Sequence, residues 1–522
     1  MQVVDFAWLK KIISNKKIQF CFLITFIFGL IAHGYSYFNL SYSHDSLVLY
    51  QNDWQWQMSI GRFMHLIVFL IRGNYYVPWL VGFISLVFIS LTLYFLSEIF
   101  NIKSKLVTGL IGGLLTSNVI YTLINATYSH DIDIYMMALF FSVLGVYLIL
   151  KSKKYWLFGV FSFVVSLGLY QSFINCAVVI FMILAIKELF DGKSIKEVFL
   201  ISIKWVLLIL LSFLIYFIVF RLLLLVFNLD YGKGYNDLSK VGKYGSFGKI
   251  ITSFALTYGF FVEKTLIPFG YNVIITKIIN IVSLILVFVL ILYIYSKKNF
   301  KFIYFIFLLL IVYLIPFGIN VTCFISQGIL HDLMTYSFVF LYVFVIWLVM
   351  YLNKIKNINK KFKYIVNYLV VGMYFVLIFN NFIYSNQVYL IKKLNYQNTL
   401  LFANRIIYSL ESLEDYKVGE MPVVFIGYTD LMKSTTVREG VDYNPTGLWN
   451  NYSVTYYDTY DYFFNRIMNY KINIDSDYFE EVNYYKRPDL IEMPNYPEKG
   501  SIKVIDGIVF IKLSEYFEIK VK

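Results

Sequence analysis

The sequence is dominated by repeated runs of about 20 consecutive apolar residues, each long enough as a helix to span a roughly 30 Å hydrocarbon layer. The 522-residue chain is 59% hydrophobic and only 15% charged, which is typical of a protein that crosses a membrane many times. We therefore predict a polytopic α-helical membrane protein with about eleven transmembrane helices. The predicted spans are residues 18–38, 77–96, 106–126, 134–150, 155–169, 172–186, 198–227, 274–295, 302–317, 335–352 and 364–383.

The positive charge of the chain follows the loops between these spans. The net charge is +13, but residues 386–522 carry 15 basic and 19 acidic side chains, so the excess lies in the apolar part. Lysines gather in alternate loops, with the exception of the lysine-bearing loop 228–271 on the predicted outer side. This pattern indicates cytoplasmic loops rather than a surface for nucleic acid. The lysine-bearing loops are residues 103–105, 151–154, 187–196, 297–301 and 354–363. They predict a multi-pass protein of the cell (plasma) membrane with its N-terminus in the cytoplasm and its C-terminal region outside.

The composition changes along the chain in a way that predicts three parts. Residues 1–17 form a cytoplasmic or interfacial segment, residues 18–385 the transmembrane domain, and residues 386–522 an extracytoplasmic soluble α/β domain. In the last part, residues 421–428 and 502–513 have the pattern of strands, the second with a hairpin turn at Asp506-Gly507. Many tyrosines lie between them, and because tyrosine rings stack on sugars this domain is a candidate holder of a glycan.

Two apolar stretches do not have the pattern of a span. Residues 64–71 are too short to cross and are expected to lie in or along the membrane interface. Residues 250–261 have helical spacing and are expected on the membrane surface, after a Gly-, Tyr- and Lys-rich loop at residues 230–248.

Several common functional motifs are absent from the sequence. There is neither a GxxxxGK[ST] phosphate loop nor a GxGxxG turn after a strand, which argues against an ATP-driven transporter. The cysteines Cys21, Cys176 and Cys323 are far apart in apolar segments and form neither a disulfide framework nor a metal-ligand spacing. The sequence does not firmly predict any cofactor. A divalent metal at the His and Asp groups is an alternative, but no ligand spacing enforces it.

Two carboxylates follow the first span and are candidates for chemistry. Asp45 lies a few residues beyond its end, where partial desolvation would raise the carboxyl pKa and suit a general base. The alternative is a helix N-cap, since Ser43, Asp45 and Ser46 are all good caps. Asp53 is a second candidate for the same role.

A second acidic group begins a later span, with His130, Asp131 and Asp133 close together in sequence. Ionisable groups that enter a membrane helix are costly unless they face a polar cavity. The alternative is capping with a favourable placement on the helix dipole. The dipeptide His-Asp occurs at residues 44–45, 130–131 and 331–332, each time on the predicted external face.

Cationic and polar side chains on the same predicted face suit a phosphate or a sugar. Arg62 is as well suited to bidentate phosphate recognition as to anchoring at headgroups, whereas Arg72 and Arg221 are interpreted as anchors. The candidates for substrate binding are His44, Arg62, His130, Asp133, Tyr170, Gln171, Lys233 and Lys243.

Short motifs in the first third of the chain resemble those of the bacterial Gtr type II glucosyltransferases. They are Ser43-His44-Asp45, the segment Gln57-Met58-Ser59-Ile60-Gly61-Arg62-Phe63, and Ser166-Leu167-Gly168-Leu169-Tyr170-Gln171-Ser172. The resemblance implies a GT-C membrane fold, a polyprenyl-phosphate sugar donor, and transfer of the sugar to a surface glycan on the outer side. It implies that Asp45 is a catalytic acidic residue and that Asp131 and Asp133 form a second acidic cluster. Here His44-Asp45 stands where two adjacent acids are usual, so the base is either Asp45 or Asp53.

These observations together predict an inverting hexosyltransferase of the bacterial cell envelope with Asp45, Asp53 and Asp131 as its catalytic residues. A lipid-linked sugar flippase and a surface-glycan polymerase or ligase are the alternatives. The expected partners are the lipid-linked donor, the acceptor glycan, membrane lipids, and a separate synthase and flippase for the donor, with no role for nucleic acid.

Overall fold

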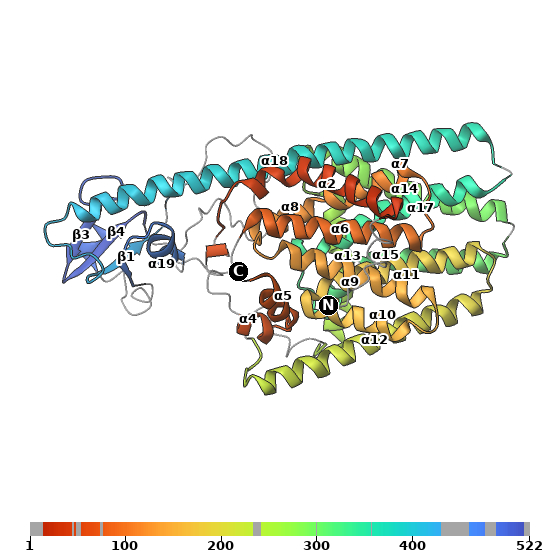
Figure 1. Ribbon diagram of the computed structural model, residues 1–522, viewed down its shortest axis with the longest axis horizontal. Helices are drawn as coiled ribbons and strands as arrows, with labels where there is room; N and C mark the ends of the chain where they lie inside the picture. The colour runs from red at the N-terminus through yellow and green to blue at the C-terminus, as the bar shows by residue number, and fades with distance from the viewer. Residues whose placement is uncertain are drawn as a thin grey trace, which may run out of the picture. The chain divides into compact units, whose positions relative to one another are not determined.

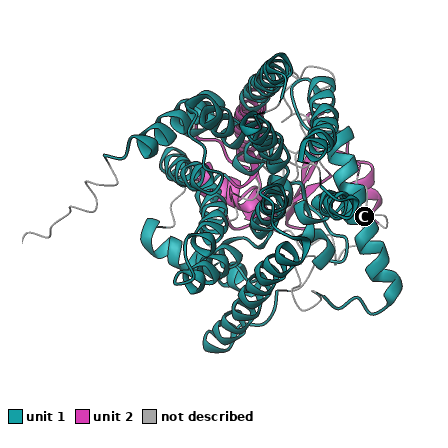
Figure 2. Cartoon of the chain, turned by 90° about the vertical axis from the view of Figure 1, so that its right-hand side faces the viewer, with its two compact units in different colours: residues 1–38, 53–125, 129–386 teal, residues 39–52, 126–128, 387–522 magenta. Residues whose placement is uncertain are grey.

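The computed structural model describes residues 14–43, 46–47, 54–73, 77–232, 242–298, 300–356, 358–427, 429, 459–475 and 487–515. The chain divides into two compact units, which Figure 2 shows in different colours. Unit 1 contains residues 1–38, 53–125 and 129–386, and unit 2 contains residues 39–52, 126–128 and 387–522.

Unit 1 is built from helices, most of which are labelled in Figure 1. They are α2 (Lys16–Phe38), α4 (Trp54–Ser59), α5 (Met64–Arg72), α6 (Pro78–Ile99), α7 (Lys105–Thr116), α8 (Val119–Thr127), α9 (Ile132–Lys151), α10 (Trp156–Leu169), η2 (Gln171–Phe173), α11 (Ile174–Phe190), α12 (Ile195–Val226), α13 (Phe247–Leu266), α14 (Val273–Lys298), α15 (Phe302–Ile319), α16 (Val321–Ile325), η4 (Asp332–Phe338), α17 (Val339–Lys354) and α18 (Lys360–Glu411), the last of which continues into unit 2.

Ten helical segments of the described chain are long and apolar enough to cross a membrane, which supports a multi-pass membrane protein. The predicted span 155–169 corresponds to α10, which at 14 residues is shorter than these ten. The roughly eleven predicted spans thus correspond, among the described residues, to ten membrane-length helices and this one shorter apolar helix. Residues 64–71 lie in the nine-residue helix α5, and the helical spacing of residues 250–261 is confirmed because they are part of α13. Their predicted locations at the membrane interface and on the membrane surface stay predictions.

Close contact between α9 and α10 depends on two glycines. A Cβ atom on Gly145 of α9 would collide with the Phe163 ring and lie 3.0 Å from the backbone oxygen of Gly159 in α10. Small residues let membrane helices approach closely, and the Ser166 hydroxyl adds a 2.8 Å hydrogen bond to the carbonyl oxygen of Ala138. The hairpin therefore brings the start of α9 and the end of α10 together.

Unit 2 contains a four-stranded sheet with strand order β2-β1-β4-β3. Strand β1 (Pro422–Ile426) pairs in parallel with β2 (Asn473–Ile474) and β4 (Ile508–Lys512), and β4 pairs antiparallel with β3 (Ile502–Ile505). Both predicted strand segments are confirmed, and Asp506 and Gly507 form the turn with φ angles of 52° and 77°. Short helices α19 (Tyr460–Tyr462) and α21 (Pro488–Ile491) accompany the sheet, and Val424, Ile426, Leu490, Met493 and Phe510 form its core.

We expect Gly145→Ala to lower the free energy of unfolding by about 1–3 kcal/mol, the usual cost of forcing extra volume into a packed contact. Gly372 of α18 is the matched control, because no atom lies within 4 Å of a Cβ added there. Gly372→Ala should leave stability unchanged or raise it by up to about 1 kcal/mol. Thermal unfolding in detergent measures both, and equal midpoints for the two variants would contradict the close contact.

Candidate functional site

A buried ion-pair cluster joins the end of α5 to the start of α9 in unit 1. The Arg72 Nε atom lies 3.0 Å from Oδ2 of Asp133, and Arg72 Nη2 lies 3.5 Å from Oδ1 of Asp131. The three side chains are 7%, 1% and 5% exposed, respectively. One guanidinium thus faces two carboxylates that the membrane-spanning helix would otherwise bury without a counter-charge.

Two histidines complete the cluster on the Asp131 side. His65 Nδ1 lies 3.8 Å and His130 Nε2 lies 3.4 Å from Oδ2 of Asp131. The other ring nitrogen of His65 is 3.0 Å from the carbonyl oxygen of Leu169, the last residue of α10. His65 therefore connects the acidic start of α9 to the end of α10.

The sequence of α5 explains why both of its polar side chains point to one place. His65, Val68, Phe69 and Arg72 have spacings of three, four and seven residues and so share one face of the helix. The start of α5 packs on α10, since a Cβ atom on Gly168 would lie 2.7 Å from the Phe63 ring. This contact presents the polar face of α5 to the start of α9.

Asp131 occupies the N-cap position of α9, but its side chain makes no capping hydrogen bond. Its oxygens instead face Arg72 and the two histidines. Asp133 lies in the first turn, where the helix dipole favours a negative charge, and its Oδ1 accepts a 2.9 Å hydrogen bond from the Ile134 amide. Capping therefore does not account for Asp131, which belongs to the ion-pair cluster.

The environment fixes the charge of two members of the cluster. Burial lowers the pKa of His65 to about 4, more than Asp131 raises it, so this imidazole is neutral near pH 7. Burial opposes ionisation of Asp131, but His130, His65 and Arg72 together outweigh it and hold the pKa of this carboxyl below its ordinary value. Asp131 is therefore an anion over the whole physiological range.

Arg62 lies in a braced turn close to this cluster. Its guanidinium carbon is 4.8 Å from the centroid of the Tyr170 ring, and Nη1 donates to Oε1 of Gln57 at 3.2 Å. Gly61, with a φ of 82°, makes the turn before it, a conformation that favours glycine. The positive charge of Arg62 also helps to lower the pKa of His65.

Gln171 holds this turn in place from the other side. Its amide nitrogen donates to the Ile60 carbonyl at 3.0 Å and to the Tyr216 hydroxyl at 3.0 Å. The Tyr216 hydroxyl in turn donates to the Gly61 carbonyl at 3.1 Å. Gln171 is thus engaged in positioning Arg62, and the structure brings together the predicted residues Arg62, Tyr170 and Gln171.

The remaining predicted residues do not join the cluster. His44, Asp45, Asp53 and Lys233 lie outside the described residues. Lys243 is exposed, and its ammonium forms no ion pair within the part of the chain that the structure describes. The third His-Asp pair, His331-Asp332, is not part of the cluster. Asp332 forms an ion pair with Lys264 at 2.6 Å.

The interpretation of Arg72 as a headgroup anchor is wrong, because its side chain is buried between two carboxylates. His65 was not among the predicted site residues at all. The sequence contains a signal that could have identified both His65 and Arg72. These residues share one face of a short helix, and the acidic group at Asp131 and Asp133 needed a cation that no prediction supplied. Among the described residues, no group of three or more His, Cys, Asp or Glu side chains is arranged to hold a metal ion.

A comparison with protein families matches residues 34–352, more than half of the chain, to the family described as glucosyl transferase GtrII. This match confirms the resemblance that the short motifs indicate, and the matched segment contains the whole cluster. No curated protein and no solved structure matches the chain.

Replacing Arg72 tests how far the cluster depends on its cation. We expect Arg72→Gln to lower the free energy of unfolding by about 3–5 kcal/mol, because it leaves two buried carboxylates uncompensated. Adding Asp133→Asn should restore part of that loss. Arg221 is the matched control, since it contacts one aromatic ring at 4.9 Å, and Arg221→Gln should cost about 1 kcal/mol or less. Equal unfolding midpoints for Arg72→Gln and Arg221→Gln would contradict the assignment.

The stability of the protein should depend on pH through His65. Its pKa is about 4 when folded and about 6.5 when unfolded, so between these values the unfolded chain binds more protons. The contribution of His65 to stability should therefore fall as the pH is lowered from 6.5 toward 4, by at most about 1.4 kcal/mol per pH unit. Unfolding midpoints measured across this window for wild type and His65→Gln test the point. The two curves should diverge across this window by the contribution of His65, with wild type losing more stability or gaining less as the pH is lowered, and parallel curves would refute it.

Proposed function

Because the chain belongs to the GtrII glucosyl transferase family, we propose that it moves a hexose from a polyprenyl-phosphate donor to a cell-surface glycan on the extracytoplasmic side. The family supports glycosyl transfer as the reaction, and the membrane-length helices support a substrate that is held in or beside a membrane. The observation that carries the proposal is the buried cluster of Arg72, Asp131, Asp133, His65 and His130 inside the matched segment.

The proposed reaction is a single displacement with inversion. Asp45 removes the proton from an acceptor hydroxyl, and the oxygen attacks the anomeric carbon of the donor sugar as the bond to the phosphate oxygen breaks. The sugar is joined to the acceptor, and polyprenyl phosphate leaves with the electron pair. Asp53 is the alternative base. Both lie outside the described residues, and their support is their position after the first helix.

Arg62 is suited to the leaving phosphate, whose negative charge grows in the transition state. Its guanidinium is held by Tyr170 and Gln57, so little ordering remains to be done when a phosphate binds. Lys233 and Lys243 are candidates for a further cation at the same phosphate. His44, His130, Asp133, Tyr170 and Gln171 are assigned to the donor site, the last of them through its support of the Arg62 turn.

Asp131 is better suited to orienting its neighbours than to accepting a proton. A carboxyl whose pKa lies below its ordinary value is a weak base at neutral pH. Its contact with His130 instead orients that imidazole, in the way that a carboxylate orients a catalytic histidine. We therefore assign proton removal to Asp45 or Asp53 and a positioning role to Asp131.

We also propose that a separate synthase makes the lipid-linked sugar and that a separate flippase delivers it to the outer side. In this arrangement the N-terminus is cytoplasmic, the C-terminal unit is extracytoplasmic, and the protein resides in the cell membrane.

Single-turnover sugar release tests the proposal. Purified protein is given polyprenyl-phosphate glucose and a surface-glycan extract, and Asp45→Asn is compared with wild type. We expect turnover to fall by about 100-fold or more, the usual scale for loss of a general base, with donor binding retained. Asp230, an exposed aspartate, is the matched control, and Asp230→Asn should not change the rate.

An unchanged rate in Asp45→Asn together with a loss in Asp53→Asn would move the base to Asp53. If wild type binds lipid-linked donors but cleaves none of them, whatever sugar or acceptor is supplied, transfer is excluded and a flippase takes its place.

A further inference from the structure

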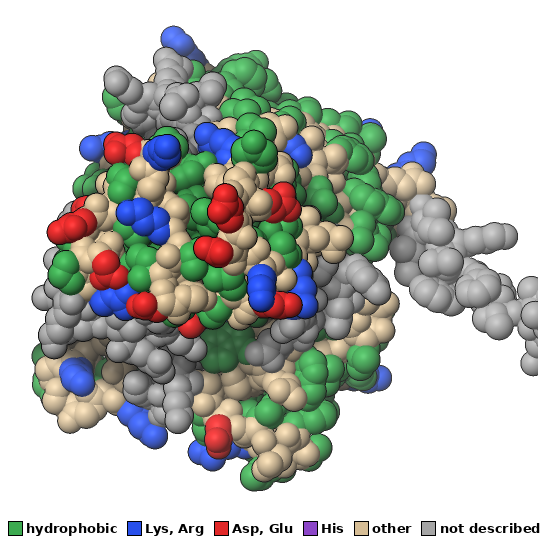
Figure 3. Space-filling model, turned by 90° about the vertical axis from the view of Figure 1, so that its left-hand side faces the viewer, with side chains coloured by type: hydrophobic (Ala, Val, Ile, Leu, Met, Phe, Trp, Pro, Cys, Tyr) green, Lys and Arg blue, Asp and Glu red, His purple; other side chains and the backbone are tan. Residues whose placement is uncertain are grey.

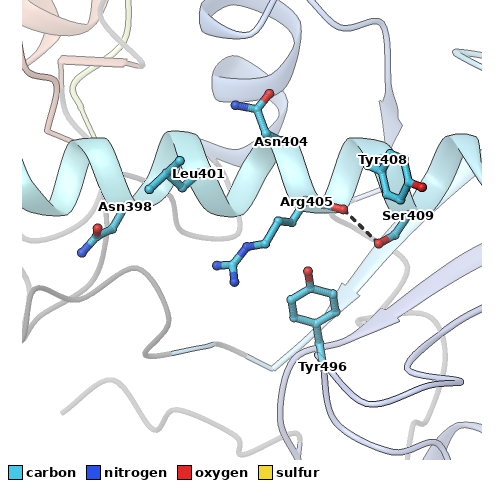
Figure 4. A pocket seen from close by; sticks show the side chains of 7 residues that line it. All are labelled: Asn398, Leu401, Asn404, Arg405, Tyr408, Ser409 and Tyr496. Carbon is cyan, nitrogen blue, oxygen red and sulfur yellow. Dashed lines mark hydrogen bonds between the residues drawn. The ribbon is translucent and has the colours of Figure 1, made fainter.

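Unit 2 has an open surface pocket of about 600 Å³ on one side of α18, called the cavity below. Six of its lining residues come from this helix and the seventh, Tyr496, comes from the segment between α21 and β3. Figure 4 shows Asn398 and Arg405 extending to the side of the helix on which Tyr496 lies. The lining residues are Asn398, Leu401, Asn404, Arg405, Tyr408, Ser409 and Tyr496.

The helix buries its opposite face, which leaves the cavity side open. Phe402, Ala403, Ile406 and Leu410 are buried, and the lining residues recur at spacings of three, four and seven on the other side of the helix. Leu401 and Tyr408 are 61% and 74% exposed. A large aromatic ring is therefore presented to whatever enters the cavity.

Tyr496 forms a fixed wall of the cavity. Its backbone amide donates to the carbonyl oxygen of Lys512 at 2.7 Å, and its ring packs edge-on against Phe402, with 5.9 Å between ring centroids. Its position is therefore set by the sheet and by the buried face of α18.

The charge of Arg405 has no counterpart in the described structure. No acidic side chain of the described residues forms an ion pair with its guanidinium, although acidic and basic groups are interspersed on the surface that Figure 3 shows. A guanidinium presents several donors in a planar fork that matches a phosphate or a carboxylate. The cavity is thus prepared for an anionic group.

The other lining groups match sugar hydroxyls. The Asn404 amide both donates and accepts hydrogen bonds, as hydroxyls do. Ser409 donates to the carbonyl oxygen of Arg405 at 2.9 Å, so its hydroxyl oxygen is left to accept — a bond that Figure 4 marks with a dashed line. Tyrosine rings stack on the apolar faces of sugars, and the cavity volume lies in the range of ligand sites.

We propose that this cavity binds an oligosaccharide that carries a phosphate or carboxylate group. Arg405 pairs with the anionic group, Tyr408 stacks on a sugar ring, and the Asn404 amide hydrogen-bonds to hydroxyls. The identification of this oligosaccharide as the acceptor rests on the proposed function. The proposal that the cavity binds it is independent of that function. A lipid headgroup would share the anion but would use neither the stacking ring nor the amide.

The test is equilibrium binding of the full-length protein in detergent to an array of phosphorylated and carboxylated oligosaccharides, each paired with its uncharged counterpart. We expect Arg405→Gln to weaken binding of the charged forms about 10-fold or more and Arg405→Lys to weaken it less. Tyr408→Ala should weaken charged and uncharged forms alike, by about 3- to 10-fold.

Matched controls lie on the same helix. Tyr368 is 75% exposed and lies outside the cavity, so Tyr368→Ala should bind like wild type, as should Gln397→Ala at another exposed position. Unfolding midpoints verify that all variants are folded. Absence of binding to every array member, binding that Arg405→Gln and Tyr408→Ala leave unchanged, or binding only to phosphatidylglycerol vesicles would overturn the proposal.

The same variants separate this inference from the proposed function. If the protein binds the glycan through Arg405 but transfers no sugar, the proposed binding site stands and the transferase assignment is rejected. If wild type and Arg405→Gln transfer sugar equally well and no glycan binds at the cavity, the transferase assignment stands and the proposed binding site is rejected.

Discussion

Two carboxylates at the start of an apolar helix need a cation beside them, and in unit 1 that cation is Arg72. Burying a charge in a membrane protein is costly unless it is paired, so this requirement fixes where α5 must end. At nine residues, α5 is too short to cross a membrane. Its place is instead set by the ion pairs of Arg72, by the contact of His65 with Leu169, and by its packing on α10.

The close hairpin of α9 and α10 also determines which side chains meet near the cluster. Because the glycine contact and the Ser166 hydrogen bond hold the two helices together, the acidic start of α9 and the turn at Tyr170 and Gln171 meet at one end. That turn holds Arg62 in position. The segment between Arg62 and Arg72 thus supplies two cations to one region, one paired with carboxylates and the other stacked on a tyrosine ring.

The fold could largely be predicted from apolar runs, whereas the site could not. Span positions and both strand segments follow from local sequence pattern. The continuation of α18 through residues 386–411 was not predicted. Buried residues recur there every three or four positions from Val388 to Leu410, but polar residues between them hide this helical periodicity. The pairing of Arg72 with Asp133 joins residues about 60 positions apart, and no local pattern specifies such a contact. His130, Asp131 and Asp133 were found because ionisable groups at a helix start are unusual. The predictions for Asp45 and Asp53 remain predictions.

A purely structural role for the cluster is the weaker explanation. Replacing a buried ion pair with apolar residues of similar size is often neutral or stabilising, so five ionisable side chains are a poor way to hold two helices together. Such groups in a membrane protein more often serve substrates or ions. His65 is neutral and Asp131 is held as an anion, so these two members of the cluster keep a fixed charge near pH 7. Such fixed charges suit the orientation of a charged substrate, and a carboxylate held as an anion leaves proton removal to a carboxylate elsewhere in the chain.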